Sequence, residues 1–162
     1  MNMRHSLLLI AALCGSTASA AGPTMEQRME AFAEVNSATS SGNQTGAADA
    51  LIAVIDDPEW DAFDGEAYAR LALLLKNLEL PYASLLAYTR ALEADAEGVG
   101  SEANKAVDLA DQVGDQAVLE PVFANNLGLD VDDATRSRMA YLAARENHRA
   151  GQLSTAAAML KL

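Results

Sequence analysis

The side chains best suited to bind a charged partner lie close to the C-terminal end of the sequence. Arg138, Tyr141, Arg145 and Arg149 are separated by three or four residues, a spacing that places them along one face of a helix. Arginines in such a row can hold carboxylates through paired, charge-assisted hydrogen bonds. The pattern predicts a basic patch for an acidic partner. The alternative is a solvated helix face, or one paired with the acidic segment before it.

The distribution of charge supports the basic patch. Residues 134–162 carry a formal charge of +4, whereas residues 21–133 carry -17 and the whole chain carries -12. This acidic excess argues against a general nucleic-acid binder, which needs cations to neutralise phosphates. It also keeps the protein soluble and repels anionic membrane surfaces.

The stretch 56–66 concentrates carboxylates, which are the oxygen ligands that calcium prefers. The EF-hand calcium loop needs alternating ligands, a glycine at its sixth position and a glutamate at its twelfth, and this stretch does not fit that frame. We therefore interpret it as a connection between helices, with Trp60 and Phe63 packed onto its neighbours.

The sequence predicts no metal, cofactor or catalytic site. His148 is the only histidine after residue 20, and only Glu146 and Arg145 stand near it, which are too few donors to hold a metal. The chain contains neither a Gly-x-Ser-x-Gly nucleophile turn nor a glycine-rich phosphate loop. These observations favour a protein that binds without catalysing and needs no cofactor.

The first twenty residues have the order of a secretory signal peptide. Arg4 and His5 precede an apolar run over 7–13, and small residues follow up to Ala20, after which we expect cleavage. The apolar run is about half the roughly twenty residues that cross a bilayer. We therefore expect an exported, periplasmic protein whose mature chain, residues 21–162, is one domain without a membrane span.

Cys14 raises the alternative of a lipid anchor. A lipoprotein signal has a small residue directly before its cysteine, and Leu13 is bulky, so lipidation is not expected. Cleavage after Ala20 leaves the mature chain without a cysteine, which excludes disulfides and thiolate sites from it.

Helical patterns run through the rest of the chain, which is rich in alanine and leucine. The clearest is 68–95, where apolar residues recur every three or four positions on both sides of the segment 77–81. Pro81 suits the first turn of a helix and not its interior. This stretch is predicted to be a helical hairpin with an apolar face on each arm.

The same layout predicts three further hairpins, over 25–56, 101–127 and 134–162. The four turns fall at Gly42, Glu79, Gly114 and Gly151, in steps of 37, 35 and 37 residues. Glycine suits such a turn because many helices end in a left-handed residue. The regular step predicts an internal repeat and an all-α fold.

The second hairpin resembles the tetratricopeptide repeat family, which repeats every 34 residues. Its match consists of Leu71-Ala72 in the first helix, then Ser84, Tyr88 and Ala91-Leu92 in the second. Small residues at such positions let neighbouring helices approach closely. The chain departs from the family at Glu79, which replaces the turn glycine, and in its longer steps.

The resemblance implies an α-solenoid of about four antiparallel helix-turn-helix hairpins, in which the first helices line a concave wall that holds an extended or helical peptide. The strongest partner-binding candidates on that wall are Lys76, Asn77, Asn104, Arg138, Tyr141, Arg145 and Arg149. The same wall is expected to include Met29, Phe32, Asn36, Thr39, Glu66, Leu73, Asp108, Asp111, Gln112 and His148.

Three functions fit this description. The first is an exported adaptor or scaffold that holds a segment of another protein in the concave groove. The second is a structural subunit of a larger cell-envelope assembly that docks through its C-terminal edge, because residues 153–162 form an apolar helix without a stop signal; this edge also allows self-association. The third is an accessory domain of an enzyme that continues beyond residue 162.

Overall fold

The computed structural model describes residues 24–95, 98–126 and 128–161. The predicted signal peptide and Cys14 lie outside these residues. The described chain is helical and contains no strand, which confirms the all-α class. Its helices are α1 (Met25–Ala31), α2 (Ala33–Ser40), α3 (Gln44–Asp56), α4 (Asp64–Asn77), α5 (Pro81–Ala94), α6 (Ala103–Val113), α7 (Glu120–Asn125), α8 (Asp133–Arg149) and α9 (Leu153–Met159). Short 3-10 turns, η1 (Pro58–Phe63), η2 (Gly100–Glu102) and η3 (Gln116–Leu119), link some of them.

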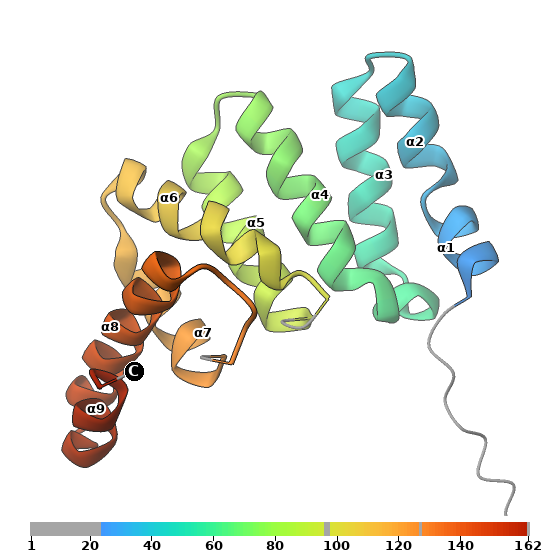
Figure 1. Cartoon of the computed structure of the whole chain (residues 1–162). Helices are drawn as coiled ribbons and strands as arrows, with labels where there is room; N and C mark the ends of the chain where they lie inside the picture. The colour runs from blue at the N-terminus through green and yellow to red at the C-terminus, as the bar shows by residue number, and fades with distance from the viewer. Residues whose placement is uncertain (1–23, 96–97, 127, 162) are drawn as a thin grey trace, which may run out of the picture.

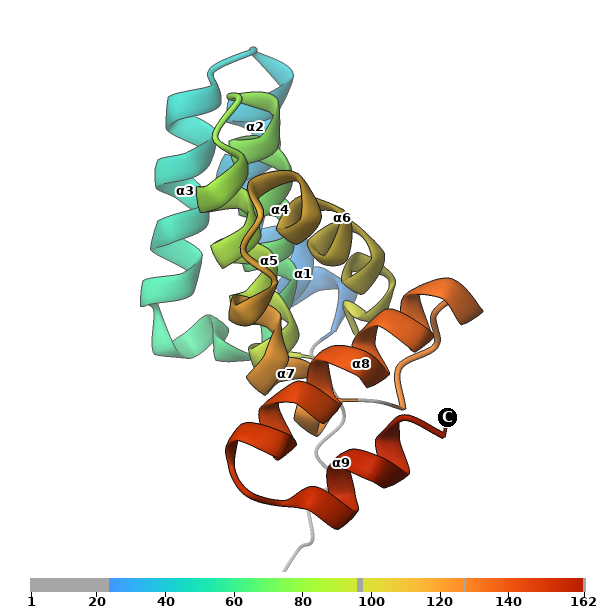
Figure 2. The same ribbon diagram turned by 90° about the vertical axis from the view of Figure 1, so that its left-hand side faces the viewer.

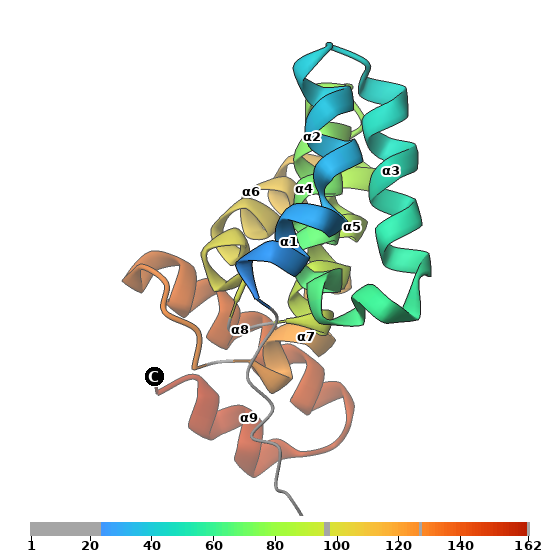
Figure 3. The same cartoon turned by 90° about the vertical axis from the view of Figure 1, so that its right-hand side faces the viewer.

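The helices stack in sequence order from α1 at one end of the molecule to α9 at the other (Figure 1). Most of the packing joins helices that follow one another, as in α2 with α3, α4 with α5 and α8 with α9. Two opposite views show α3 and α5 on one side of the stack and α6 on the other (Figures 2 and 3). No helix of the described chain is both long and apolar enough to cross a membrane.

The four predicted turn positions share one backbone conformation. Gly42, Gly114 and Gly151 have φ between 74° and 76°, Glu79 has φ 60°, and they are the positive-φ residues of the described chain. In each turn, the backbone N–H of the residue that follows the positive-φ residue donates to a carbonyl oxygen of the preceding helix. This hydrogen bond defines a Schellman motif. These bonds run from Asn43 N to Ala38 O, Leu80 N to Leu75 O, Asp115 N to Ala110 O and Gln152 N to Asn147 O, over 2.8–3.0 Å.

Two apolar cores hold the stack together. The N-terminal core lies among α2, α3, η1 and α4, and the larger C-terminal core extends from α4 to α8. The α4 helix joins them, because Ala67 is buried in the first and Ala72 in the second. Ser84 is also buried, and its hydroxyl donates to the Ala72 carbonyl over 2.7 Å. This small residue allows α5 to lie close against α4.

The first hairpin differs from the expected one. Its first arm is broken into α1 and α2 at Phe32, a residue that the sequence predicts on the concave wall. That prediction was wrong, because Phe32 is buried and its ring meets the ring of Phe63 edge-on at 5.8 Å. The expected packing of Phe63 and Trp60 is confirmed, since both join the N-terminal core.

The third hairpin has a short second arm. Leu119 is fully buried in η3, and Pro121 follows in the first turn of α7. The α7 helix packs mainly against α8 and scarcely against α6. The third hairpin is therefore stabilised mainly by the packing of α7 against α8. Its two arms, α6 and α7, do not pack against each other along their length.

The left-handed turns give a first testable prediction. A non-glycine residue in this conformation costs about 1 kcal/mol, so Glu79→Gly should raise the free energy of unfolding by roughly 0.5–1 kcal/mol. Gly114→Ala should lower it by about 1 kcal/mol, although nothing lies within 4 Å of the added methyl group. Urea denaturation followed by circular dichroism measures both. Equal effects of the two substitutions, or the opposite signs, would contradict a left-handed turn at Glu79.

Candidate partner-binding surface

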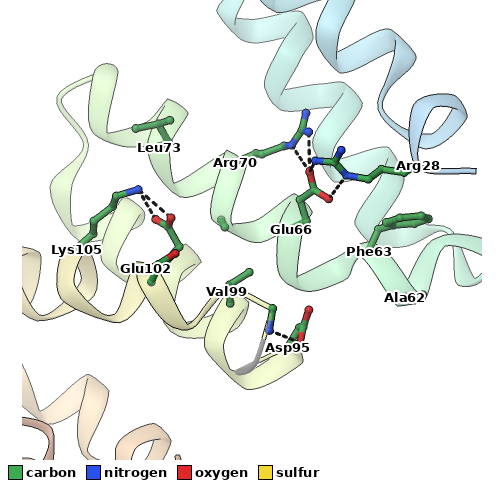
Figure 4. Close-up of a pocket in the computed structure, with 13 residues that line it drawn as sticks. Arg28, Ala62, Phe63, Glu66, Arg70, Leu73, Asp95, Val99, Glu102 and Lys105 are labelled. Carbon is green, nitrogen blue, oxygen red and sulfur yellow. Dashed lines mark hydrogen bonds and ion pairs between the residues drawn. The ribbon is translucent and has the colours of Figure 1, made fainter. Parts of the chain in front are cut away.

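A groove of about 540 Å³ opens between α4 and α6, and α1 lies at its edge. We call it the central groove (Figure 4). Its walls combine apolar and charged side chains from α1, η1, α4, the connection between α5 and η2, η2 itself and α6. They are Arg28, Ala62, Phe63, Glu66, Ala69, Arg70, Leu73, Asp95, Gly98, Val99, Ser101, Glu102 and Lys105.

One end of the central groove is built around the carboxylate of Glu66. Arg28 donates to it from Nε over 2.7 Å and from Nη2 over 2.6 Å, and Arg70 donates over 2.9 and 2.6 Å. Arg70 in turn lies 4.2 Å above the ring of Phe32 and donates to Asn36 Oδ1 over 3.2 Å. The carboxylate therefore ties α1 to α4 and fixes both guanidinium groups at the groove edge.

The charge of Glu66 is stabilised by this arrangement. Partial burial opposes its ionisation, but the hydrogen bonds and positive charges of Arg28 and Arg70 outweigh it and hold the pKa of Glu66 below its ordinary value of 4.5. The same contacts raise the pKa of Arg28. Glu66 and Arg28 are therefore both charged at neutral pH.

The facing wall carries a second ion pair. Lys105 Nζ lies 2.6 Å from Glu102 Oε2, and Asp95 accepts from the Gly98 N–H over 2.9 Å. Leu73, opposite, exposes 47% of its surface. The groove thus has three cations and three carboxylates, so it is locally neutral in a chain of net charge -12.

Tyr88 is buried in the C-terminal core, with no hydrogen-bond partner for its hydroxyl in the described part of the chain. Burial, and then the nearby negative charge of Glu102, raise the pKa of Tyr88 to about 12. The phenol is therefore neutral at physiological pH, and its ring serves as packing.

The predicted arginines lie on α8, but carboxylates of the same chain already hold them. Arg138 forms ion pairs with Asp108 and Asp111 of α6. Arg145 and Arg149 converge on Glu120 at the start of α7, with Arg145 Nη2 3.1 Å from Glu120 Oε1. The structure therefore shows the alternative arrangement, a face paired with acidic residues earlier in the chain.

Glu120 is the central group of this second cluster. Its side chain is fully buried at 0% exposure, yet two cations share its single charge, so the cluster keeps one positive charge. The guanidinium group of Arg145 also lies 5.7 Å from the ring of Tyr141, which is exposed. Binding of a partner by this face stays a prediction.

The other predicted candidates do not join the central groove. Asn77 lines a separate cavity of about 230 Å³ among α2, α3 and α4. Lys76 is exposed beside it. Asn104 is half-buried at the start of α6, with its Oδ1 atom out of contact with solvent. Sequence spacing placed these residues on the correct helices but did not bring them together.

Three residues of the central groove were not predicted from the sequence. Arg70 stands four residues after Glu66, and Lys105 three after Glu102, so helical spacing could have found both pairs. Arg28 lies 38 residues from its partner Glu66, and no local pattern announces that contact.

A second groove, of about 440 Å³, lies between α8 and α9. We call it the C-terminal groove. It is mostly apolar, with arginines and a histidine at its edge. Its lining consists of Tyr141, Ala144, Arg145, His148, Arg149, Leu153, Ala156, Ala157 and Leu160.

No family model, curated protein or solved structure matches this chain. Its function must therefore be argued from the two grooves. Among the described residues, no three histidine, cysteine, aspartate or glutamate side chains are placed to hold a metal ion.

The Glu66 cluster predicts a dependence of stability on pH. The pKa of Glu66 is lower in the folded state than in the unfolded state. The stabilisation by its carboxylate is therefore fully present above pH 4.5 and is lost as the pH falls through the folded-state pKa. Glu66→Gln should cost about 1 kcal/mol at pH 7 and progressively less in acid. Urea denaturation at several pH values measures this. Glu93→Gln, which breaks an exposed pair with Arg90, is the control and should have a smaller effect.

The Glu120 cluster predicts a larger loss of stability on mutation than the Glu66 cluster does. Arg145→Ala combined with Arg149→Ala strands a buried carboxylate and should lower the free energy of unfolding by about 3–5 kcal/mol. Adding Glu120→Gln should restore much of the loss, because the stranded charge is then removed. Thermal and urea denaturation measure all three proteins. If the double variant were as stable as the original protein, Glu120 would not be a buried, paired charge.

Proposed function

We propose that this protein is an exported adaptor that holds a segment of another protein in its central groove. The observation that carries the proposal is the groove itself, an open, locally neutral channel with an exposed leucine, between helices that are the first arms of successive hairpins. Such a mixture of apolar surface and placed polar groups suits the binding of a peptide.

The proposed architecture is a tetratricopeptide-like α-solenoid of four hairpins. Four Schellman turns at near-equal steps support it, as does the packing of successive helices. The second hairpin adds the burial of Ser84, Tyr88 and Ala91, three of the residues that resemble the repeat family. In this arrangement α4 and α6 belong to the concave wall.

The chemistry of the central groove suits binding better than catalysis. The carboxylate of Glu66 is held by two arginines, that of Glu102 by Lys105, and that of Asp95 by a backbone N–H. Carboxylates fixed in this way hold charged side chains in place for a partner.

Export rests on the first twenty residues. Mass spectrometry of the protein recovered from the periplasm of a producing cell tests it, with a chain that begins at Ala21 as the expected result.

The C-terminal groove supports the alternative function, a subunit of a larger assembly that docks through its C-terminal edge. Its lining is mostly apolar, and helix α9 covers only one side of it. An adaptor that also assembled in this way would use two separate surfaces.

Matched variants test the central groove. Leu73 lies in it and is 47% exposed, whereas Leu86 lies on α5 outside it and is 43% exposed. Peptides selected from a displayed random library against the original protein should lose at least about tenfold in affinity, or roughly 1.4 kcal/mol, on Leu73→Asp. Leu86→Asp should leave their affinity unchanged.

Fluorescence anisotropy with synthetic peptides gives the dissociation constants, and circular dichroism checks that both variants fold. Equal weakening by the two substitutions, or no weakening by Leu73→Asp, would remove the central groove as the binding site.

A further inference from the structure

The two ends of the stack carry complementary surfaces. At one end, the C-terminal groove offers exposed Leu153 and Leu160, which keep 61% and 62% of their surface in solvent. Arg145 and Arg149 lie at its edge. They share the single charge of Glu120, so the groove lining is apolar with one excess positive charge; Glu146 of α8 is not part of that lining.

At the other end, α1 presents an apolar pair between acids. Met25 and Met29 are one helical turn apart and expose 66% and 67% of their surface. Glu26 and Glu30 are exposed beside them. The only cation of this helix, Arg28, shares the charge of Glu66 with Arg70, which leaves one positive charge against the two exposed acids. The exposed face of α1 is therefore apolar and still negative.

Contacts within the chain fix both the start of α1 and its position on the surface. Thr24 accepts from the Gln27 N–H over 3.2 Å, and the Gln27 side chain accepts from the Thr24 N–H over 2.8 Å. This capping box fixes the start of the helix, and the Arg28 to Glu66 pair anchors it to α4. Both methionines are therefore held at the surface.

We propose that the C-terminal groove binds helix α1 of a second copy of this chain. Met25 and Met29 of one copy cover the apolar groove of the next, and Glu26 and Glu30 face Arg145, Arg149 and Lys161. The proposal rests on the alternative function, docking through the C-terminal edge, and names its partner. It does not involve the central groove.

The contact is head-to-tail, because α1 and α9 lie at opposite ends of the stack (Figure 1). After two copies pair, one copy keeps its α1 surface unused and the other keeps its C-terminal groove unused. A contact of this type builds open chains, or rings if the rotation closes. Since part of the attraction is between exposed charges, it weakens as salt is raised.

Two end variants and their mixture test the proposal. The head variant carries Met25→Ser and Met29→Ser, and the tail variant carries Leu153→Asp and Leu160→Asp. All four residues are exposed, so both variants should fold. Ile52→Ser on α3, where the side chain is 46% exposed, is the matched control. Sedimentation velocity of residues 21–162, which contain both cores, gives the mass at rising concentration.

The original protein and Ile52→Ser should grow in mass with concentration, and each end variant should associate at least about tenfold more weakly. A mixture of the two end variants should form a 1:1 dimer and nothing larger, because only one intact head and one intact tail remain. Raised salt should dissociate the original protein.

Three results would overturn the proposal. The original protein could stay monomeric up to about 1 mM, a concentration at which even weak contacts form. The mixture could stay monomeric. The head variant could associate as well as the original protein, which would indicate a tail-to-tail contact. Peptide binding to the central groove is measured separately, so failure here leaves that function standing.

Discussion

Each turn within a hairpin depends on one residue in the left-handed conformation. At Gly42, Glu79 and Gly151, only three residues separate the paired helices, and the N–H after the left-handed residue bonds back into the helix just completed. A connection so short forces the second helix to lie along the first. The apolar faces of the two arms then have only each other and the next hairpin to cover them, and the stack follows from that requirement.

The turns explain why the class of fold could be predicted from the sequence. Three of them carry glycine, for which a positive φ costs nothing, so the repeat was visible without an alignment. Glu79 was predicted as a turn residue only from its spacing to the three glycines. Its φ of 60° shows that this position adopts the left-handed conformation even without glycine. The break at Phe32 could not be predicted in the same way. Neither glycine nor proline marks it, and it coincides with the burial of the Phe32 ring against Phe63, a contact between residues far apart in the sequence.

The candidate site was predictable only where its contacts are local. Helical spacing correctly placed Arg138, Arg145 and Arg149 along α8, but a count of charges says nothing about which are already paired. Their partners lie 25 to 30 residues earlier in the chain, and the burial of Glu120 is a property of the packed α7 and α8. The excess of basic residues after position 133 was therefore real, yet much of it neutralises carboxylates of the same molecule.

This internal pairing bears on where an acidic protein can bind anything. At a net charge of -12, most of the surface repels other acidic molecules and stays hydrated. A partner can bury surface at low cost only where the charges are already compensated, because an unpaired charge must lose its hydration when it is covered. The central groove meets this condition with three cations against three carboxylates, whereas the C-terminal groove keeps one excess positive charge because its two arginines share one buried glutamate. Both clusters also stabilise the fold, so the residues that set the charge of each surface are the residues that hold it in shape.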